Sequence, residues 1–105
     1  MPSETLDLTI TPHVQGQGGK YVAHLAGEST TGYLEWEPGG ERDGKPIRIA
    51  THTIVPQKIG GRGVAAALVD RLVADAQRHD FLIEPQCSYV AAKFQDHPEW
   101  GDFRA

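Results

Sequence analysis

A glycine-rich segment in the middle of the chain, from Val55 to Ala65, has residue types suited to holding an anion. Glycine adopts positive φ angles and lets the backbone approach a ligand, and Gly60, Gly61 and Gly63 supply that freedom. The segment leads into a helix-forming run, and the first N–H groups of a helix have no partner within it and carry the positive end of its dipole. Arg62 would add a full positive charge. The pattern predicts a pyrophosphate cradle, although such turns also occur without a ligand.

Two better-known nucleotide fingerprints do not match this segment. The pattern G-x-x-x-x-G-K-[ST] is absent, and G-x-G-x-x-G would need a third glycine where Ala66 stands. The segment does follow an apolar run, Ile47 to Val55, and it opens a helix, which is the arrangement that phosphate binding requires.

The single cysteine, Cys87, cannot form an internal disulfide. Its side chain is therefore either a small buried hydrophobe or a thiol with chemistry. His52 stands between two threonines on an expected strand, where its ring either points into a cleft or lines a face of the sheet. The five histidines and one cysteine show no paired C-x-x-C or H-x-x-x-H spacing, so no metal site is expected.

Hydrophobic periodicity predicts five strands. Apolar and polar residues alternate from Leu6 to Ile10, and this run stops near Pro12. Glycine-rich turns separate the first three strands, and residues 38–44 are typical of a polar loop. The expected strands cover residues 6–10, 21–25, 32–37, 47–55 and 81–84.

Two helices are expected. Apolar residues recur every four positions from Val64 to Ala76, and polar residues, Asp75 among them, are expected on the remaining face. A short last helix would be capped by Ser88 and would end before Pro98.

The order of these elements predicts an α+β fold in one domain, residues 1–105. Four largely antiparallel strands precede the helix, and a strand, a helix and a strand of this length imply a parallel final pair. The sheet is therefore mixed and mostly antiparallel, with a central helix after the fourth strand and a short C-terminal helix. Ligands gather beyond the ends of such parallel strands, here Val55-Pro56 and Pro85 to Cys87, which should be neighbours.

Composition argues against several partners. Ten Lys and Arg against fourteen Asp and Glu give a formal net charge of −4, which offers no attraction to nucleic acid or to an anionic membrane. No apolar stretch approaches the roughly 18 residues that span a bilayer. The start, Met1 to Glu4, has neither a basic region nor an apolar signal core, so a cytoplasmic location is expected.

The glycine-rich segment resembles the acyl-CoA-binding motif of the GNAT N-acetyltransferase superfamily, Arg/Gln-x-x-Gly-x-Gly/Ala. Gly63 and Ala65 match its last two positions, and Gly60 stands where Arg or Gln is usual. Residues Pro85 to Tyr89 and the tail His97 to Trp100 are similar to a family of very small GNAT-like proteins, which pair a Pro-x-Cys-Ser-Tyr segment with a His-Pro-Glu-aromatic tail.

This resemblance implies a minimal GNAT-like fold that binds acetyl-CoA or coenzyme A. It assigns the pantetheine arm to the backbone of Ile54 and Val55, and the acyl thioester to the neighbourhood of Cys87 and His52. Main-chain N–H groups of the motif would hold the pyrophosphate. The cofactor-binding residues expected there are Gly60, Gly61, Arg62, Gly63, Val64 and Ala65.

Two residues of the last helix have an assigned role and an ordinary alternative. Tyr89 could donate a proton to the CoA thiol, or it could pack against the core. Lys93 could meet a CoA phosphate, or it could lie on a solvated helix face. His97 could reach the site from the tail, whose ordinary role is to dock the C-terminus through Trp100 and Phe103.

Two mechanisms and three functions remain open on these residues. A Cys87 thiolate could take the acetyl group and pass it on if a helix start or an imidazole lowered its pKa. Alternatively, an acceptor amine could attack directly while His52 or a water removes its proton. The functions are N-acetyl transfer to an unidentified small-molecule or protein amine, CoA binding without turnover, or a structural protein in which the glycine segment is only a turn.

Overall fold

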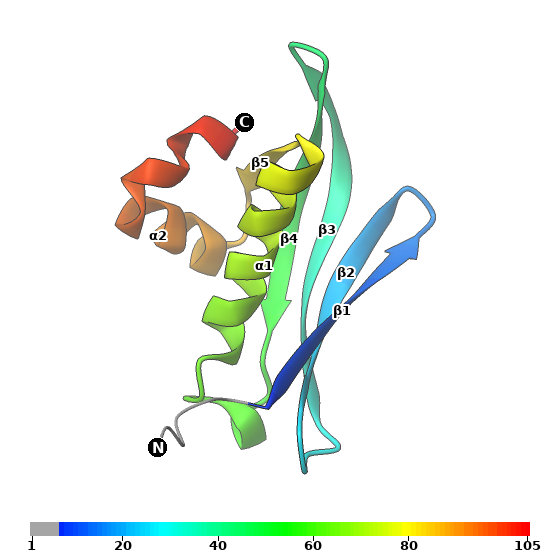
Figure 1. Cartoon of the computed structure of the whole chain (residues 1–105), viewed down its shortest axis with the longest axis vertical. Coiled ribbons are helices and arrows are strands. Elements are labelled where there is room, and N and C mark those ends of the chain that lie inside the picture. Colours follow the sequence, from blue (N-terminus) through cyan, green and yellow to red (C-terminus); the bar gives the residue numbers. More distant parts are fainter. Residues whose placement is uncertain (1–6) are drawn as a thin grey trace.

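The computed structural model describes residues 7–105, which form one five-stranded sheet with helices packed against it (Figure 1). The strands stand side by side in chain order, and β5 is parallel to β4 while the other neighbours are antiparallel. The strands are β1 (Leu8–Gln15), β2 (Gly18–Leu25), β3 (Thr31–Arg42), β4 (Lys45–Ile54) and β5 (Leu82–Pro85). The helices are α1 (Val64–His79), α2 (Ser88–Asp96) and two 3₁₀ helices, η1 (Gln57–Ile59) and η2 (Pro98–Phe103). The expected α+β fold is confirmed.

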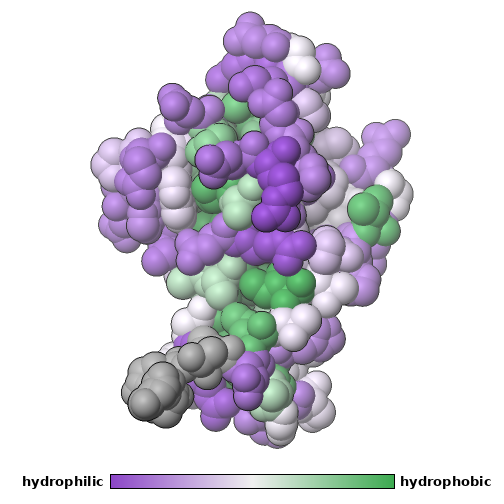
Figure 2. Space-filling view, in the orientation of Figure 1, coloured by the Kyte–Doolittle hydropathy of each residue, from purple (hydrophilic) through white to green (hydrophobic). Residues whose placement is uncertain are grey.

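Both α-helices lie on the same face of the sheet (Figure 1), and the hydrophobic core fills the space between the helices and the sheet. Large side chains from every layer are fully buried there, among them Tyr21, Leu34, Leu68 and Ile83. Each such side chain stabilises the fold by about 1.5 to 3 kcal/mol through removal of its apolar surface from water. The outer surface of α2 and of the C-terminal half of α1 is hydrophilic, whereas hydrophobic residues gather around the first turns of α1 (Figure 2).

Helix α1 follows directly from the four-residue apolar spacing and from its two ends. It begins after Gly63 and ends before Asp80, and both flanking residues have left-handed backbone conformations, with φ of 78° and 61°. Glycine adopts that conformation without steric cost. Within residues 7–105 no helix is long and apolar enough to cross a membrane.

The first strand extends further than its sequence pattern indicated. Leu6, where that strand was expected to begin, lies outside the described residues. The expectation that the run stops near Pro12 is wrong, because β1 continues to Gln15 and Pro12 pairs with Tyr21 of β2. Strand β1 is at the edge of the sheet, and an edge strand tolerates a proline because one of its sides has no neighbouring strand to receive an N–H.

The expected polar loop at residues 38–44 is instead the end of a long hairpin. Strand β3 runs to Arg42 and β4 starts at Lys45, so Asp43 and Gly44 alone make the turn. Their φ angles are 54° and 81°, as a two-residue hairpin turn of the Asp-Gly kind requires. The pairing is irregular between Pro38 and Glu41, where a bulge accommodates the proline and the glycines.

The C-terminal tail docks onto the core. Trp100 and Phe103 are partly buried against the core cluster, and the Trp100 ring meets Phe94 of α2 edge to face, with ring centroids 5.4 Å apart. The last residue, Ala105, donates its backbone N–H to the carbonyl oxygen of Ile83 at 2.8 Å. The tail therefore covers the outer edge of β5.

Two local expectations on the helices are wrong. Ser88 is the first residue of α2, and Cys87 is the capping residue before it. Asp75 does not lie on the exposed face of α1, because its relative exposure is 6% and its carboxylate accepts a hydrogen bond from the buried Tyr21 hydroxyl at 2.9 Å.

Candidate active site

The glycine-rich segment forms a tight turn between η1 and α1. Gly61 and Gly63 have φ angles of 73° and 78°, so both use the conformation that glycine alone adopts freely. Gly60 differs, because its φ is −71° and its N–H already donates to the carbonyl oxygen of Gln57 at 3.0 Å. The first α-helical bond runs from Ala67 to Gly63. The N–H groups available to a ligand therefore begin at Gly61.

The donors of this turn follow one another along the chain into α1. The N–H groups of Val64 and Ala65 belong to the first turn of the helix, where no preceding carbonyl is in place to accept them. The helix dipole adds a partial positive charge at the same point, and no acidic side chain lies in the first turn to offset it. The segment therefore has the donors and the electrostatics of an anion site.

Arg62 carries the only full charge of the glycine turn, and it is paired. Its Nη1 lies 3.4 Å from Oε2 of Glu28, which is in the turn between β2 and β3. The Arg62 side chain is 48% exposed, so solvent screens this pair and it contributes little to stability. Glu28 holds the guanidinium beside the turn and would compete with an anionic ligand for it.

Strands β4 and β5 separate close to the glycine turn. Their pairing ends at Ala50 and Pro85, and the last bond between the two segments runs from the Cys87 N–H to the Ala50 carbonyl oxygen at 2.8 Å. Strand β4 continues alone on that side to Ile54, and the chain after β5 turns away into α2. The expected meeting of the two strand ends therefore occurs at Ala50 and Cys87, four residues before the end of β4. Within the part of the chain that the structure describes, Thr51 to Ile54 have no strand partner on the β5 side.

Cys87 lies at the start of α2 and faces β4. Its Sγ is 3.6 Å from the hydroxyl oxygen of Thr53, and its side chain is partly buried against the core. Burial by itself raises the pKa of a thiol, but the Val90 N–H, the Thr53 hydroxyl and the Tyr89 N–H together outweigh it, so the pKa of Cys87 is lowered from its ordinary value. A lowered pKa increases the thiolate fraction near neutral pH, and the thiolate is the nucleophilic form.

The structure does not bring His52 and Cys87 together. In the register of β3 and β4, Thr53 pairs with the buried Leu34, which faces the helices, whereas His52 pairs with Glu35 on the other face of the sheet. Successive side chains of a strand point to opposite faces, so the exposed His52 ring and the Cys87 thiol are separated by the sheet. His52 lines a sheet face, which is one of the two alternatives that the sequence left open.

The remaining predicted residues surround the separated strands. Ile54 is 45% exposed at the end of β4, and Val55 packs against the core. Tyr89 is 36% exposed in the first turn of α2, and Lys93 lies one turn further along the helix. His97 is held in the tail, where its ring stacks on Trp100 and its Nδ1 is 2.9 Å from Glu99 Oε2.

Two residues at this site were not predicted from the sequence. Thr53 meets the Cys87 thiol, and Glu28 pairs with Arg62. The two-residue period of a strand would have placed the Thr53 and His52 side chains on opposite faces of the sheet. The contact between Thr53 and Cys87 depends, however, on the bend of the chain after β5. Glu28 gave no signal, because it lies in a turn 34 residues away from its partner. Within residues 7–105 no group of three His, Cys, Asp or Glu side chains is arranged to hold a metal ion.

The chain was compared with family models and with curated protein sequences. No curated protein sequence matches the chain. The family model described as GCN5-related N-acetyl-transferase matches residues 20–103, which include most of β2, all of β3 to β5, both α-helices, the glycine turn and Cys87. The match covers most of the chain and agrees with the observed sheet and with the helix after β4. The chain therefore belongs to the GCN5-related N-acetyltransferase family, whose general function is of the acetyltransferase type.

Proposed function

We propose that this protein binds acetyl-CoA and transfers its acetyl group to an amine. The observation that supports this most directly is the unpaired edge of β4 from Thr51 to Ile54. The glycine turn lies beyond its Ile54 end, and Cys87 lies alongside it, with its N–H bonded to Ala50 and its thiol in contact with Thr53. An extended thioester ligand needs an anion site, a line of backbone partners and a reacting centre in that order. Its acidic and acyl ends would then meet the glycine turn and Cys87, respectively.

The pyrophosphate would accept hydrogen bonds from the N–H groups of Gly61 to Ala65. These donors come from the backbone and need no charged side chain, so the replacement of the usual Arg or Gln by Gly60 leaves them in place. The pantetheine arm would bond to the backbone of Ile54 and Val55. Lys93 supplies a positive charge on α2 for a further phosphate.

Cys87 is the proposed nucleophile. Its thiolate would attack the carbonyl carbon of acetyl-CoA, so that a new S–C bond forms and the C–S bond to CoA breaks, with the CoA thiolate as leaving group. An amine would then attack the S-acetyl cysteine, form the amide and return the thiolate. The acceptor's proton leaves to water or to the CoA thiolate, and Tyr89, at the start of α2, is a candidate donor to that thiolate.

Direct transfer from acetyl-CoA to the amine is the competing mechanism. In that case His52 or a water would remove the proton of the amine, and Cys87 would not become acylated. The position of His52 on the opposite face of β4 favours water over His52 as the base on the Cys87 side.

CoA binding without turnover is the second candidate function. Two observations favour it: the first motif position is Gly60, whose N–H is occupied by Gln57, and the Arg62 charge is already paired with Glu28. A weakened anion site would still bind CoA through the backbone but would hold the thioester less firmly for reaction.

Intact-mass spectrometry with acetyl-CoA, run beside a thermal-shift titration with CoA, separates these possibilities. The proposal predicts stabilisation by CoA, a gain of one acetyl group on the wild-type protein, and no gain on Cys87→Ala. Stabilisation without a mass change indicates direct transfer or binding alone, and an assay with a panel of amines then distinguishes the two. Absence of any stabilisation at saturating CoA, where about 2.7 kcal/mol is expected at 100 times the dissociation constant, contradicts the proposal.

A further inference from the structure

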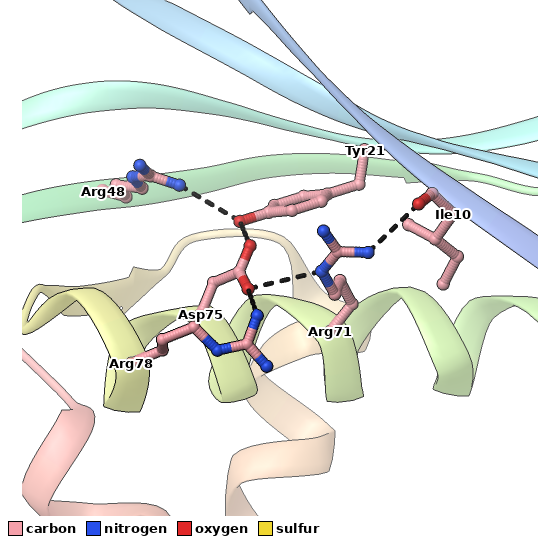
Figure 3. A network of polar contacts seen from close by, with 6 residues as sticks. All are labelled: Ile10, Tyr21, Arg48, Arg71, Asp75 and Arg78. Atoms are coloured by element: carbon pink, nitrogen blue, oxygen red, sulfur yellow. Dashed lines mark hydrogen bonds and ion pairs between the residues drawn. The ribbon is translucent and has the colours of Figure 1, made fainter.

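The C-terminal half of α1 holds a second group of polar side chains, far from the glycine turn (Figure 3). Asp75 lies at its centre. Its Oδ2 accepts a hydrogen bond from the Tyr21 hydroxyl at 2.9 Å, and its Oδ1 accepts one from Arg71 Nε at 3.3 Å. Arg78 Nη1 lies 3.8 Å from the same Oδ1, and Arg48 Nη1 donates to the Tyr21 hydroxyl oxygen at 3.1 Å. Three arginines thus surround one carboxylate.

The single carboxylate leaves this group with a surplus of positive charge. Arg71 also donates to the carbonyl oxygen of Ile10 at 3.1 Å, which anchors it to β1. Arg78 is beyond hydrogen-bond distance from Asp75 and its side chain is 66% exposed. Burial, followed by the hydrogen bond to Asp75, raises the pKa of Tyr21, so Tyr21 stays protonated and supplies no negative charge. The surplus stands out because the whole chain is acidic, with a formal net charge of −4.

Arg48 is the most constrained of the three arginines. Its guanidinium lies 4.0 Å from the ring centroids of both Trp36 and Phe81. Within the described residues its one polar contact is the neutral Tyr21 hydroxyl, and no carboxylate lies within ion-pair distance. Two aromatic rings fix the plane of the guanidinium, and among residues 7–105 its remaining N–H groups have no acceptor. A fixed guanidinium fork suits carboxylate and phosphoryl oxygens because it binds them with two parallel bonds.

The three arginines, together with Tyr21 and Asp75, line a pocket of about 200 Å³. Its walls are β1 and β2 on one side and α1 on the other, and His79 at the end of α1 also contributes. The pocket is smaller than the about 300 to 1,000 Å³ typical of sites for drug-sized ligands. It therefore suits a ligand of few atoms, or the charged end of a larger one.

We propose that this pocket binds a small oxyanion, a carboxylate or phosphoryl group, between Arg48 on β4 and Arg71 and Arg78 on α1. An anion there would bridge the β1–β2 hairpin to α1 and offset the unpaired positive charge. The pocket is distinct from the glycine turn, because Asp75 is twelve residues after Gly63 along α1, a separation of about 18 Å at the rise of an α-helix. The proposal does not depend on acetyl-CoA binding.

The experiment is a titration of ¹⁵N-labelled protein with phosphate and, separately, with succinate, at constant ionic strength set by sodium chloride. Backbone and arginine Nε–H signals are followed by NMR, so binding at the pocket is distinguished from phosphate binding at Gly61 to Ala65. We expect saturable shifts at Tyr21, Arg48 and Arg71 with at least one of the two anions. The anion that binds more tightly identifies the phosphoryl or the carboxylate class.

Arg78→Gln is the main variant, because its exposed side chain can be changed without disturbing the core. We expect it to weaken anion binding at least tenfold. Arg48→Lys keeps the charge and removes the planar fork, so it should weaken binding as well. Arg42→Gln is the matched control, since Arg42 is an exposed arginine at the end of β3, outside the pocket, and its binding should equal that of wild type.

Three results would overturn the proposal. One is the absence of saturable shifts at the pocket with either anion at concentrations up to about 50 mM. Another is binding that Arg78→Gln leaves unchanged, because the anion would then not lie between Arg48 and the arginines of α1. The third is equal shifts when sodium chloride alone is added in a separate titration, because the pocket would then only sense ionic strength.

Discussion

The two ends of α1 carry hydrogen-bond donors of different kinds. At its start the donors are backbone N–H groups freed by Gly61 and Gly63, and the one charged side chain, Arg62, is exposed and paired across the surface with Glu28. In its C-terminal half the donors are side chains, held around the buried Asp75. Backbone donors depend on φ and ψ rather than on residue type, whereas side-chain donors depend on residue type and on each other.

Because of this difference, we expect substitutions at one end of α1 to change mainly stability and substitutions at the other end to change mainly ligand binding. A change at the Asp75 end should mainly alter the free energy of unfolding, because the polar groups there are buried and share partners. A change at the glycine end should mainly alter CoA binding, because few protein contacts depend on the turn.

Asp75→Ala should have the largest effect on stability. It leaves the buried Tyr21 hydroxyl without its acceptor and removes the one carboxylate among three arginines, so the free energy of unfolding should fall by about 3 kcal/mol. Urea denaturation measures this change. Asp70→Ala is the matched control, since Asp70 is an exposed residue of the same helix and should change stability by no more than about 0.5 kcal/mol. Equal losses of unfolding free energy in the two variants would contradict the proposed difference between the two ends of α1. A loss of CoA affinity in folded Asp75→Ala would contradict it as well.

Gly61→Ala should lower the affinity for CoA by about tenfold or more while costing about 1 kcal/mol of stability. A side chain at φ 73° is strained, and relief of that strain rotates the N–H groups that would face the pyrophosphate. Gly40→Ala is the control, because Gly40 has a φ of 84° and, like Gly61, nothing within 4 Å of an added Cβ. Urea denaturation of both variants should show equal losses of stability, and isothermal titration with CoA should show unequal affinities. Equal affinities of the two variants for CoA would mean that the glycine turn has only a structural role and does not contact the ligand.

Thr53→Val should raise the pKa of Cys87, because it removes a hydroxyl that favours the thiolate. The rate of alkylation by iodoacetamide measures the thiolate fraction as a function of pH. In the wild-type protein the rate should reach its half-maximum below the pH typical of a free cysteine, and in Thr53→Val that midpoint should move upward.

The control for this shift is Thr51→Val on the same strand. The Thr51 hydroxyl donates to the Glu35 carbonyl oxygen at 3.2 Å and does not contact the thiol, so its loss should leave the midpoint in place. A midpoint in Thr53→Val equal to that of wild type would show that Thr53 does not tune the thiol.

Glu28→Gln should have the smallest effect, a tightening of CoA binding by about two- to threefold. It frees Arg62 from an exposed pair that is worth less than about 1 kcal/mol, and the released guanidinium can then approach a phosphate. Arg62→Gln should change affinity in the opposite direction. The sign is decisive here, since weaker binding in Glu28→Gln would mean that Glu28 positions Arg62 instead of competing for it.

The strongest sequence patterns gave the right fold. The four-residue apolar spacing of α1, the glycine before it and the strand after it were sufficient for the parallel pair of β4 and β5. Errors arose where local composition suggested a break. Pro12 and the glycines at 39 and 40 lie inside strands, because an edge position and a bulge accommodate them.

Two of the missed features had a signal in the sequence. Asp43-Gly44 is a favoured two-residue hairpin turn, and it lies between two strand-forming runs. Asp75 follows Leu68 and Leu72 at positions i, i+4 and i+7, so it belongs to the apolar stripe of α1 and its burial was predictable. Its partner Tyr21 is 54 residues away and was not predictable without the sheet register.

The geometry around Cys87 depends on tertiary structure. The motif placed Cys87 near the end of β5, but the contact with Thr53 and the separation from His52 result from the register of β4 and from the bend into α2. Local sequence carries neither piece of information.

The most direct test of the proposed acetyl-CoA site is an NMR titration of the ¹⁵N-labelled protein with CoA. The proposal predicts saturable shifts of the amide signals of Gly61 to Ala65 and of Thr51 to Ile54, with the same dissociation constant for both segments. Signals of the Asp75 end should move little. A titration in which neither segment responds, or in which CoA perturbs only the arginine pocket, would contradict the assignment of the glycine turn and the unpaired edge of β4 to one ligand.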